Sequence, residues 1–291
     1  MRSSIRGATV LSLIAVVAKI FQLQWSIGSF RILARFSPGE RGEILYVADN
    51  LLGLMIQVGV VGSMGSLLAH WRENKYHIED IVSFLICLGG LFVSASRGAI
   101  MGSSVGLLFL AFNYGPFVTL VAAVVLSGSL VMAAVIRKVG NFLEIFQDPV
   151  RLIIWQTTLK AIFARPLFGW GPGVFRQAFE RYRPAGFTTD VTCAHSDYLN
   201  IFIGWGLVGG LIFWGWQFFI LVRSWLKGLN PLQRTIAAVL IAFYVHVGVN
   251  DLFAAYAGLF LGLLQHPSFF EEKESWGIVS RIGGEKPLNA Q

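Results

Sequence analysis

Long apolar runs, separated by short polar segments, recur along the 291-residue chain. Several of them approach the roughly 17–25 residues that an α-helix needs to cross a bilayer. Eight spans are predicted, at residues 8–22, 51–69, 80–95, 98–113, 116–136, 198–222, 235–248 and 250–265. This pattern predicts an all-α polytopic membrane protein with about eight spanning helices.

Composition agrees with that fold class and narrows the range of functions. Hydrophobic residues make up 55% of the chain and charged residues 13%, and the mean hydropathy is +0.65, which argues against a soluble protein. The net charge is +7, but the basic residues are spread over the inter-helix loops rather than forming one stripe. Nucleic acid is therefore not an expected partner, whereas membrane lipid and an anionic substrate are.

The polar segments divide the chain into four parts. Membrane helices are expected over 1–136 and 198–265, a large structured loop over 137–197, and a polar tail over 266–291. The segment 223–234 holds three basic residues and no acidic one, which places it in the cytoplasm. Counting spans from there puts the long loop, and with it the turn around Arg97 and the turn at Asn250, on the opposite side of the membrane.

The long loop contains a predicted helix that begins at Asp148-Pro149, because Asp is a favoured N-cap and Pro a favoured first residue. Apolar residues then recur on one face, so this helix is expected to rest on the membrane surface. They are Leu152, Trp155, Leu159 and Phe163.

Arg151 lies in the first turn of this helix, where the helix dipole disfavours a cation. An anion such as a phosphate, shared with the exposed backbone N–H groups, would account for it. The following turn contains Gly169, Gly171 and Gly173, which either only connect helices or let the backbone come close to a ligand.

Two further polar residues stand next to apolar segments. Arg97 is the only charge between two predicted spans; it either caps a hairpin at the interface or presents a fixed cation to an outer cavity. His195 either is solvated at the rim of the next helix or acts as a general base, since its ordinary pKa suits that task. Asp197 and Tyr198 are candidate supporting residues, whereas Asn250 is explained by turn chemistry alone.

Arg97, Arg151 and His195 are all expected on one side of the membrane. Two arginines and a base there suit a lipid-linked pyrophosphate, with the arginines on the phosphates and the base on an acceptor hydroxyl. The histidines and carboxylates show no metal-ligand spacing, so neither a metal nor another cofactor is expected. Cys87 and Cys193 do not suggest a disulfide framework.

Three stretches of the sequence resemble the O-antigen ligase and polymerase family of bacterial membrane proteins. They are ASRGA at 95–99, RLIIWQTTLKAIFARPLFGWGPGVF at 151–175 and AHSDYLNIFIGWGLVGG at 194–210. The segment YVADNLLG at 46–53 resembles the Asn-containing outer segment of that family. The sequence departs from the family pattern at Ser196, where Asn is usual, and at Gly204, where many members have Glu.

The resemblance implies a metal-independent, inverting glycosyltransferase of the GT-C type in the bacterial inner membrane, acting on polysaccharide of the cell envelope. It implies transfer of a glycan from undecaprenyl pyrophosphate to a hydroxyl of a glycan, lipid or protein, on the periplasmic side. Arg97 and Arg151 match the family's pyrophosphate-binding arginines, and His195 matches its general base. Ligase and polymerase activity are not distinguished, because both use the same donor.

Two other classes of function remain open from the sequence. A transporter or flippase of an anionic lipid or solute would use the same arginines without needing His195, but it should carry charged residues deep in several spans, and those are scarce here. An inactive chain that acts as an assembly partner in an envelope complex is the third reading.

Overall fold

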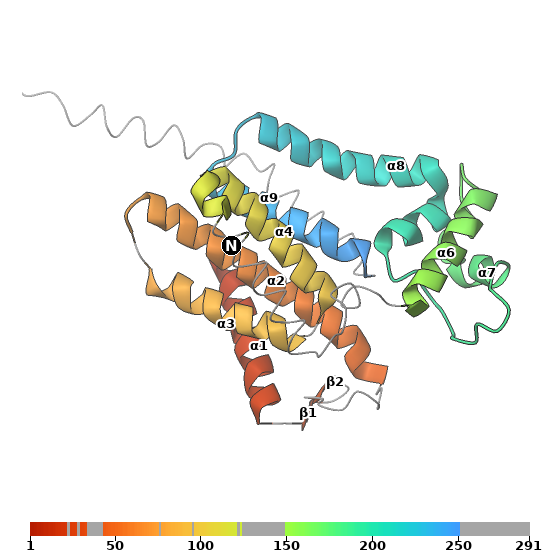
Figure 1. The fold of residues 1–291 in the computed structure, drawn as a ribbon, viewed down its shortest axis with the longest axis horizontal. Helices are drawn as coiled ribbons and strands as arrows, with labels where there is room; N and C mark the ends of the chain where they lie inside the picture. Colours follow the sequence, from red (N-terminus) through yellow and green to blue (C-terminus); the bar gives the residue numbers. More distant parts are fainter. Residues whose placement is uncertain are drawn as a thin grey trace, which may run out of the picture.

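The computed structural model describes residues 1–21, 24–27, 30–33, 43–75, 77–94, 96–120, 123 and 149–250. Within them it is mainly α-helical (Figure 1). The helices are α1 (Arg2–Ile20), α2 (Glu43–Arg72), α3 (Ile78–Ser94), α4 (Arg97–Tyr114), α6 (Pro149–Ala164), α7 (Phe175–Glu180), α8 (Asp197–Leu226) and α9 (Pro231–Gly248).

One short hairpin departs from the all-α expectation. Strands β1 (Gln24–Ile27) and β2 (Phe30–Leu33) pair antiparallel, with Gln24 opposite Leu33. The hairpin lies between the spans predicted at 8–22 and 51–69. A pair this small adds no sheet to the architecture, which remains a helical one.

Three helices in the described part of the chain are long and apolar enough to cross a membrane: Leu52–Arg72 of α2, Asp197–Leu226 and Pro231–Gly248. They coincide with three of the predicted spans. Helices α1, α3 and α4 also fall where spans were predicted and pack in the same bundle, but they are not among these three. Most of the span predicted at 116–136, and the one at 250–265, lie outside the described residues, as does the tail.

The centre of the bundle is the contact of α4 with α9. Three glycines spaced by four residues, Gly98, Gly102 and Gly106, lie on the α4 face that meets α9. A Cβ at Gly106 would stand 2.9 Å from the Cβ of Ala242, so only a glycine lets the two backbones approach this closely. Small residues at four-residue spacing are the usual means by which membrane helices pack tightly.

The bundle has two ends at which the chain's turns gather (Figure 1). At one end, a cleft is lined by Met1, His70 and Asn230, and Arg234 donates to the Asn113 carbonyl. We call it the opposite end, because it lies opposite the candidate site. Asn230 and Arg234, in the segment expected in the cytoplasm, therefore lie at this end with the start of α1 and the end of α2.

The other end, called the site end, carries the start of α4, helices α6 and α7, the start of α8 and the last turn of α9. The turn at Arg97, the described part of the long loop and the turn at Asn250, which are expected outside the cytoplasm, lie together at this end. In Figure 1, α6 and α7 are placed beside the start of α8 on the right of the view.

Candidate active site

The segment 246–250, at the end of α9, connects the elements that carry the three predicted site residues. Its Val249 carbonyl accepts a hydrogen bond from Arg151, and its Asn250 carbonyl accepts one from the Asp197 N–H, two residues after His195. The ring of His246 lies beside Ser96, the residue before Arg97. Three stretches that are far apart in the sequence thus meet at one place.

Arg97 is the first residue of α4, and the residue before it caps the helix. Ser96 has extended backbone geometry, and its Oγ accepts the Ala99 N–H at 3.3 Å. The same hydroxyl donates to Oδ1 of Asn50 in α2, at 3.0 Å. Ser96 is buried while Arg97 is exposed, so the cap fixes the turn and leaves the guanidinium at the surface of the site end.

Arg151 and Trp155 lie one turn apart on α6, and each ties that helix to a different part of the site. Arg151 Nη1 donates to the Val249 carbonyl at 2.6 Å, and Trp155 Nε1 donates to the Ala194 carbonyl at 2.9 Å. The last carbonyls of a helix lack intrahelical partners and carry negative partial charge. The end of α9 therefore stabilises the Arg151 cation, which the dipole at the start of α6 disfavours. Arg151 thus has a bond within the protein besides any bond to an anion.

His195 is held in an unusual backbone conformation. Its φ is +50°, in the left-handed region where residues other than glycine are uncommon and cost on the order of 1–3 kcal/mol. The neighbouring Ala194 has both backbone groups bonded, with its N–H donating to Asn200 Oδ1 at 2.8 Å. Cys193 Sγ lies 3.7 Å from the Nδ1 edge of the His195 ring. The surrounding bonds therefore impose this conformation on His195.

The two candidate supporting residues differ in position. Asp197 is buried at the start of α8, and its backbone N–H reaches the Asn250 carbonyl at 3.3 Å. Tyr198 points into the bundle: its hydroxyl donates to the Tyr244 carbonyl, and its ring lies 4.3 Å from that of Trp214. Both residues fasten the start of α8 to α9 in this structure.

The glycine-rich turn is built into a break in α8. Gly206 has φ +66° and ψ −170° inside the helix, which interrupts the α-helical hydrogen bonds. The turn replaces them, because Trp170 N–H donates to Ile203 O at 2.8 Å and Gly171 N–H donates to Gly204 O at 2.9 Å. The packing leaves no room for a side chain at Gly169, where a Cβ would be 2.6 Å from the Gly206 nitrogen.

Gly169 and Gly171 thus contact α8 directly. Gly173 differs, because a Cβ there would meet nothing within 4 Å. All three have positive φ, which explains why glycine occupies each position. The sequence analysis did not predict the break, although four glycines between residues 204 and 210 interrupt the apolar run there.

A buried polar cluster lies behind the arginines, and the sequence analysis missed it. His246 is fully buried; its Nδ1 lies 2.9 Å from Gln57 Oε1 and its Nε2 lies 3.4 Å from Ser96 Oγ. Asn250 is also buried, and its Oδ1 has no hydrogen-bond partner among the described residues, nor has Gln57 Nε2. The available signal was polar residues within apolar spans, which in membrane proteins are costly and often functional.

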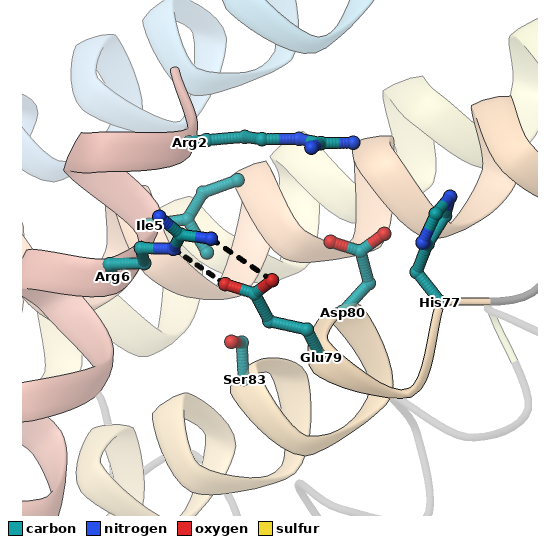
Figure 2. Close-up of a pocket in the computed structure, with 7 residues that line it drawn as sticks. All are labelled: Arg2, Ile5, Arg6, His77, Glu79, Asp80 and Ser83. Carbon is teal, nitrogen blue, oxygen red and sulfur yellow. Dashed lines mark hydrogen bonds and ion pairs between the residues drawn. The ribbon is translucent and has the colours of Figure 1, made fainter.

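A second polar pocket lies at the opposite end and is lined by Arg2, Arg6, His77, Glu79 and Asp80, among others (Figure 2). Arg6 Nε donates to Glu79 at 2.6 Å, and this bond lowers the pKa of the Glu79 carboxyl below its ordinary value. Both side chains are more than half exposed, so the pair contributes little stability.

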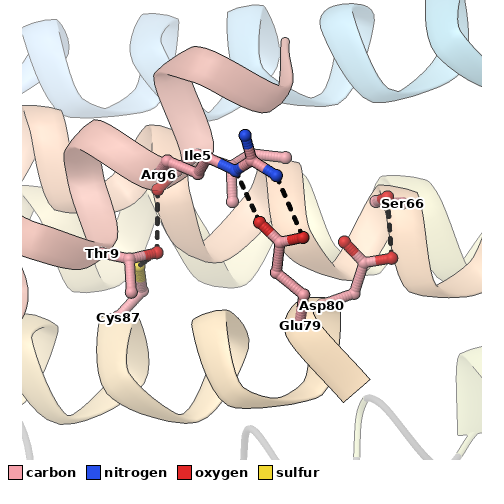
Figure 3. A network of polar contacts seen from close by, with 7 residues as sticks. All are labelled: Ile5, Arg6, Thr9, Ser66, Glu79, Asp80 and Cys87. Atoms are coloured by element: carbon pink, nitrogen blue, oxygen red, sulfur yellow. Dashed lines mark hydrogen bonds and ion pairs between the residues drawn. The ribbon is translucent and has the colours of Figure 1, made fainter. Parts of the chain in front are cut away.

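The polar contacts continue from this pocket along the bundle (Figure 3). The buried carboxylate of Asp80 accepts from Ser66 Oγ at 3.0 Å and lies 2.8 Å from His70 Nδ1. The carboxylates of Glu79 and Asp80 are thus each paired, with Arg6 and His70 respectively.

In the described part of the chain, no group of three or more His, Cys, Asp and Glu side chains is arranged to hold a metal ion. The polar groups around the last turn of α9 include arginine, histidine, amide and hydroxyl groups and the carboxyl group of Asp197. These can bind an anion through hydrogen bonds and transfer a proton.

Fold and site together define a helical membrane protein with a cationic, histidine-containing site at one end of its bundle. Residues 82–214 match the family model described as O-antigen ligase. The match contains Arg97, Arg151 and His195, and it confirms the predicted family. It supports glycan transfer of the O-antigen ligase or polymerase type, with lipid-linked glycan as the general substrate class. No curated protein matches the chain.

Proposed function

We propose that this protein transfers a glycan from undecaprenyl pyrophosphate to an acceptor hydroxyl on the periplasmic side of the bacterial inner membrane. The observation that carries the proposal is the convergence at the end of α9. Segment 246–250 contacts the turn before Arg97, the Arg151 side chain and the start of α8 after His195. The end of α9 thereby holds together the segments that carry Arg97, Arg151 and His195.

In the proposed reaction, the acceptor hydroxyl attacks the anomeric carbon of the glycan while His195 takes the hydroxyl proton. The bond from the anomeric carbon to the pyrophosphate oxygen breaks, and undecaprenyl pyrophosphate leaves with the bonding electrons. Arg97 and Arg151 stabilise the negative charge that develops on the leaving group. Because Cys193 lies on the Nδ1 edge of His195, we assign the Nε2 edge to the acceptor hydroxyl.

Attack from the face opposite the leaving group inverts the anomeric configuration, and no step requires a metal. The proposal covers both a ligase and a polymerase, which differ only in whether the acceptor is another molecule or a second glycan unit.

The test is glycan transfer in membranes that contain wild type, Arg97→Ala, Arg151→Ala or His195→Ala at matched expression. Product is read on a gel, and undecaprenyl-linked donor is quantified on each face of the membrane. Loss of a general base costs on the order of 10²–10⁴-fold in rate, and loss of one charge-stabilising donor costs about 10²–10³-fold. Arg223→Ala, an exposed arginine near the end of α8 at the opposite end, serves as the matched control and should keep full transfer.

Each outcome separates two classes of function. Donor that accumulates on the periplasmic face, with no product, supports a transferase. Full transfer by His195→Ala would refute its role as the base. Donor trapped on the cytoplasmic face would show that the protein moves lipid, which is the flippase alternative.

A further inference from the structure

The buried ring of His246 connects α2 to the turn that carries Arg97. One ring edge faces Gln57 Oε1 in α2 at 2.9 Å, and the other faces Oγ of Ser96, the N-cap of α4, at 3.4 Å. The ring is 0% exposed, so water cannot replace either contact. The ring therefore joins α2, through Gln57, to the start of α4, through Ser96.

The tautomer follows from the shorter contact. An amide oxygen only accepts, so the Nδ1–H of His246 donates to Gln57 Oε1, and Nε2 is left as an acceptor. The Ser96 hydroxyl has a single proton, which lies between two acceptors: Asn50 Oδ1 at 3.0 Å and, more weakly, His246 Nε2 at 3.4 Å. Its oxygen also accepts the Ala99 N–H that begins α4, so the contact of His246 with Ser96 reaches the first turn of that helix.

The backbone on either side strengthens this link. At Gly98, the residue after Arg97, a Cβ would collide with the His246 ring and with Asn250 Nδ2. The His246 carbonyl accepts the Val249 N–H, and the Val249 carbonyl accepts Arg151. The His246 ring thus contacts the turn that carries Arg97, and the His246 carbonyl closes the turn at Val249, which binds Arg151.

We propose that His246 is a positioning residue that sets the distance and orientation of Arg97 relative to Arg151 through its Nε2 contact with Ser96. This inference rests on the proposed function, because it concerns the geometry of the pyrophosphate site. His246 does not touch the substrate; it acts through the cap of α4 and the end of α9. A displacement of about 1 Å in a catalytic group can cost on the order of 10²-fold in rate.

The experiment separates the two ring edges. The side-chain amide of asparagine reaches the position of Nδ1, and that of glutamine reaches the position of Nε2. His246→Gln therefore keeps the Ser96 contact and loses the Gln57 contact, whereas His246→Asn does the reverse. kcat and the apparent KM for lipid-linked donor are measured for both, with thermal stability in detergent measured on the same preparations.

We expect His246→Gln to keep kcat within about threefold of wild type and His246→Asn to lose about 10–100-fold. The KM should change little, because an interaction realised in the transition state lowers kcat alone. The order of stability should be the reverse, since His246→Asn keeps the shorter hydrogen bond. A residue that only holds α9 to α2 would instead give activity that follows stability.

Ser96 provides a second pair of variants, which alters the same contact from the side of α4. Ser96→Thr keeps the hydroxyl and should keep kcat, whereas Ser96→Ala should reproduce the kcat loss of His246→Asn. The lost cap by itself costs only about 1 kcal/mol of stability. If both His246 variants are equally active or equally inactive, or if Ser96→Ala is fully active, the positioning role is wrong.

Wild type and Arg97→Ala are assayed in parallel to separate the two proposals. If wild type transfers no glycan, the proposed function has failed. If wild type is active and Arg97→Ala is not, but the His246 variants fail to separate, only this inference has failed.

Discussion

At the scale of single residues, the site end depends on positions where no further atom fits. Gly98 follows Arg97 and faces α9, and the side chains of His246 and Asn250 occupy the space that a Cβ would take. Interiors are packed so densely that one added methyl group forces neighbouring atoms to move. Glycine at this position therefore lets the first turn of α4 lie directly against α9.

Gly98→Ala is expected to push the Arg97 turn away from α9 and to lower glycan transfer at least tenfold. Overpacking of this kind costs about 1–3 kcal/mol of stability. Gly215→Ala in α8 is the matched control, because a Cβ there meets nothing within 4 Å. Transfer and thermal unfolding in detergent are measured for both. Unchanged transfer by Gly98→Ala would show that the contact of the turn with α9 does not matter for the site.

At the scale of elements, the outer loop is attached to the membrane helices through the break in α8. Four backbone hydrogen bonds join residues 166–171 to residues 203–208, from Trp170, Gly171, Leu207 and Val208 N–H groups. The first part of α8, which begins next to His195, is thus held against α6 and α7. A cluster of Ala161, Ile162, Ala178 and Ile203 fills the space between them.

Gly206→Ala is expected to disrupt this attachment, because Gly206 has positive φ and a Cβ would collide with the Leu167 carbonyl. Transfer should fall at least tenfold, and limited proteolysis should cut the turn at 166–173 faster. The matched control is Gly186→Ala: Gly186 also has positive φ, but its Cβ position is open. It bears only the strain of the left-handed backbone, about 1–2 kcal/mol. Equal effects of both variants would show that contact with α8 is not the cause.

At the scale of the whole molecule, the polar chemistry is divided between two ends. The site end holds Arg97, Arg151 and His195 around the last turn of α9, and the opposite end holds a separate group of polar residues that includes the pair of Arg6 with Glu79. Between the ends, α8 exposes large apolar side chains, which suits contact with lipid. They include Trp205, Leu211, Ile212, Trp216 and Phe219.

Cysteine labelling tests the proposed orientation of these ends. Cys193 is half-buried near His195, and Cys87 is fully buried. We expect a membrane-impermeant maleimide applied from the periplasmic side to label Cys193. In a Cys193→Ser background, Lys227→Cys should be labelled only after the membrane is permeabilised. Labelling of Lys227→Cys in sealed cells would reverse the orientation and place the proposed reaction in the cytoplasm.

Much of the architecture could be read from local patterns. Helix α9 begins at Pro231, and its capping box of Asn230 and Gln233 is a local signal. The spans at α2, α8 and α9 were predictable because an apolar run of sufficient length satisfies its backbone hydrogen bonds only as a helix. The break at Gly206 was not predictable in the same way, because a glycine in an apolar run is also compatible with a continuous helix.

For the site, the sequence by itself determined which residues can carry charge and protons: Arg97, Arg151 and His195, within the O-antigen ligase segment at 82–214. It also determined that they stand at the ends of apolar helices, since charge avoids the bilayer centre. Only the tertiary structure decided that α9 is the element joining them and that His246 lies between Gln57 and Ser96. The physical reason is that these contacts join residues far apart in the sequence, such as Arg151 with Val249 (98 positions) and Gln57 with His246 (189 positions). Such distant pairings depend on how the helices pack together, which no local pattern in the chain records.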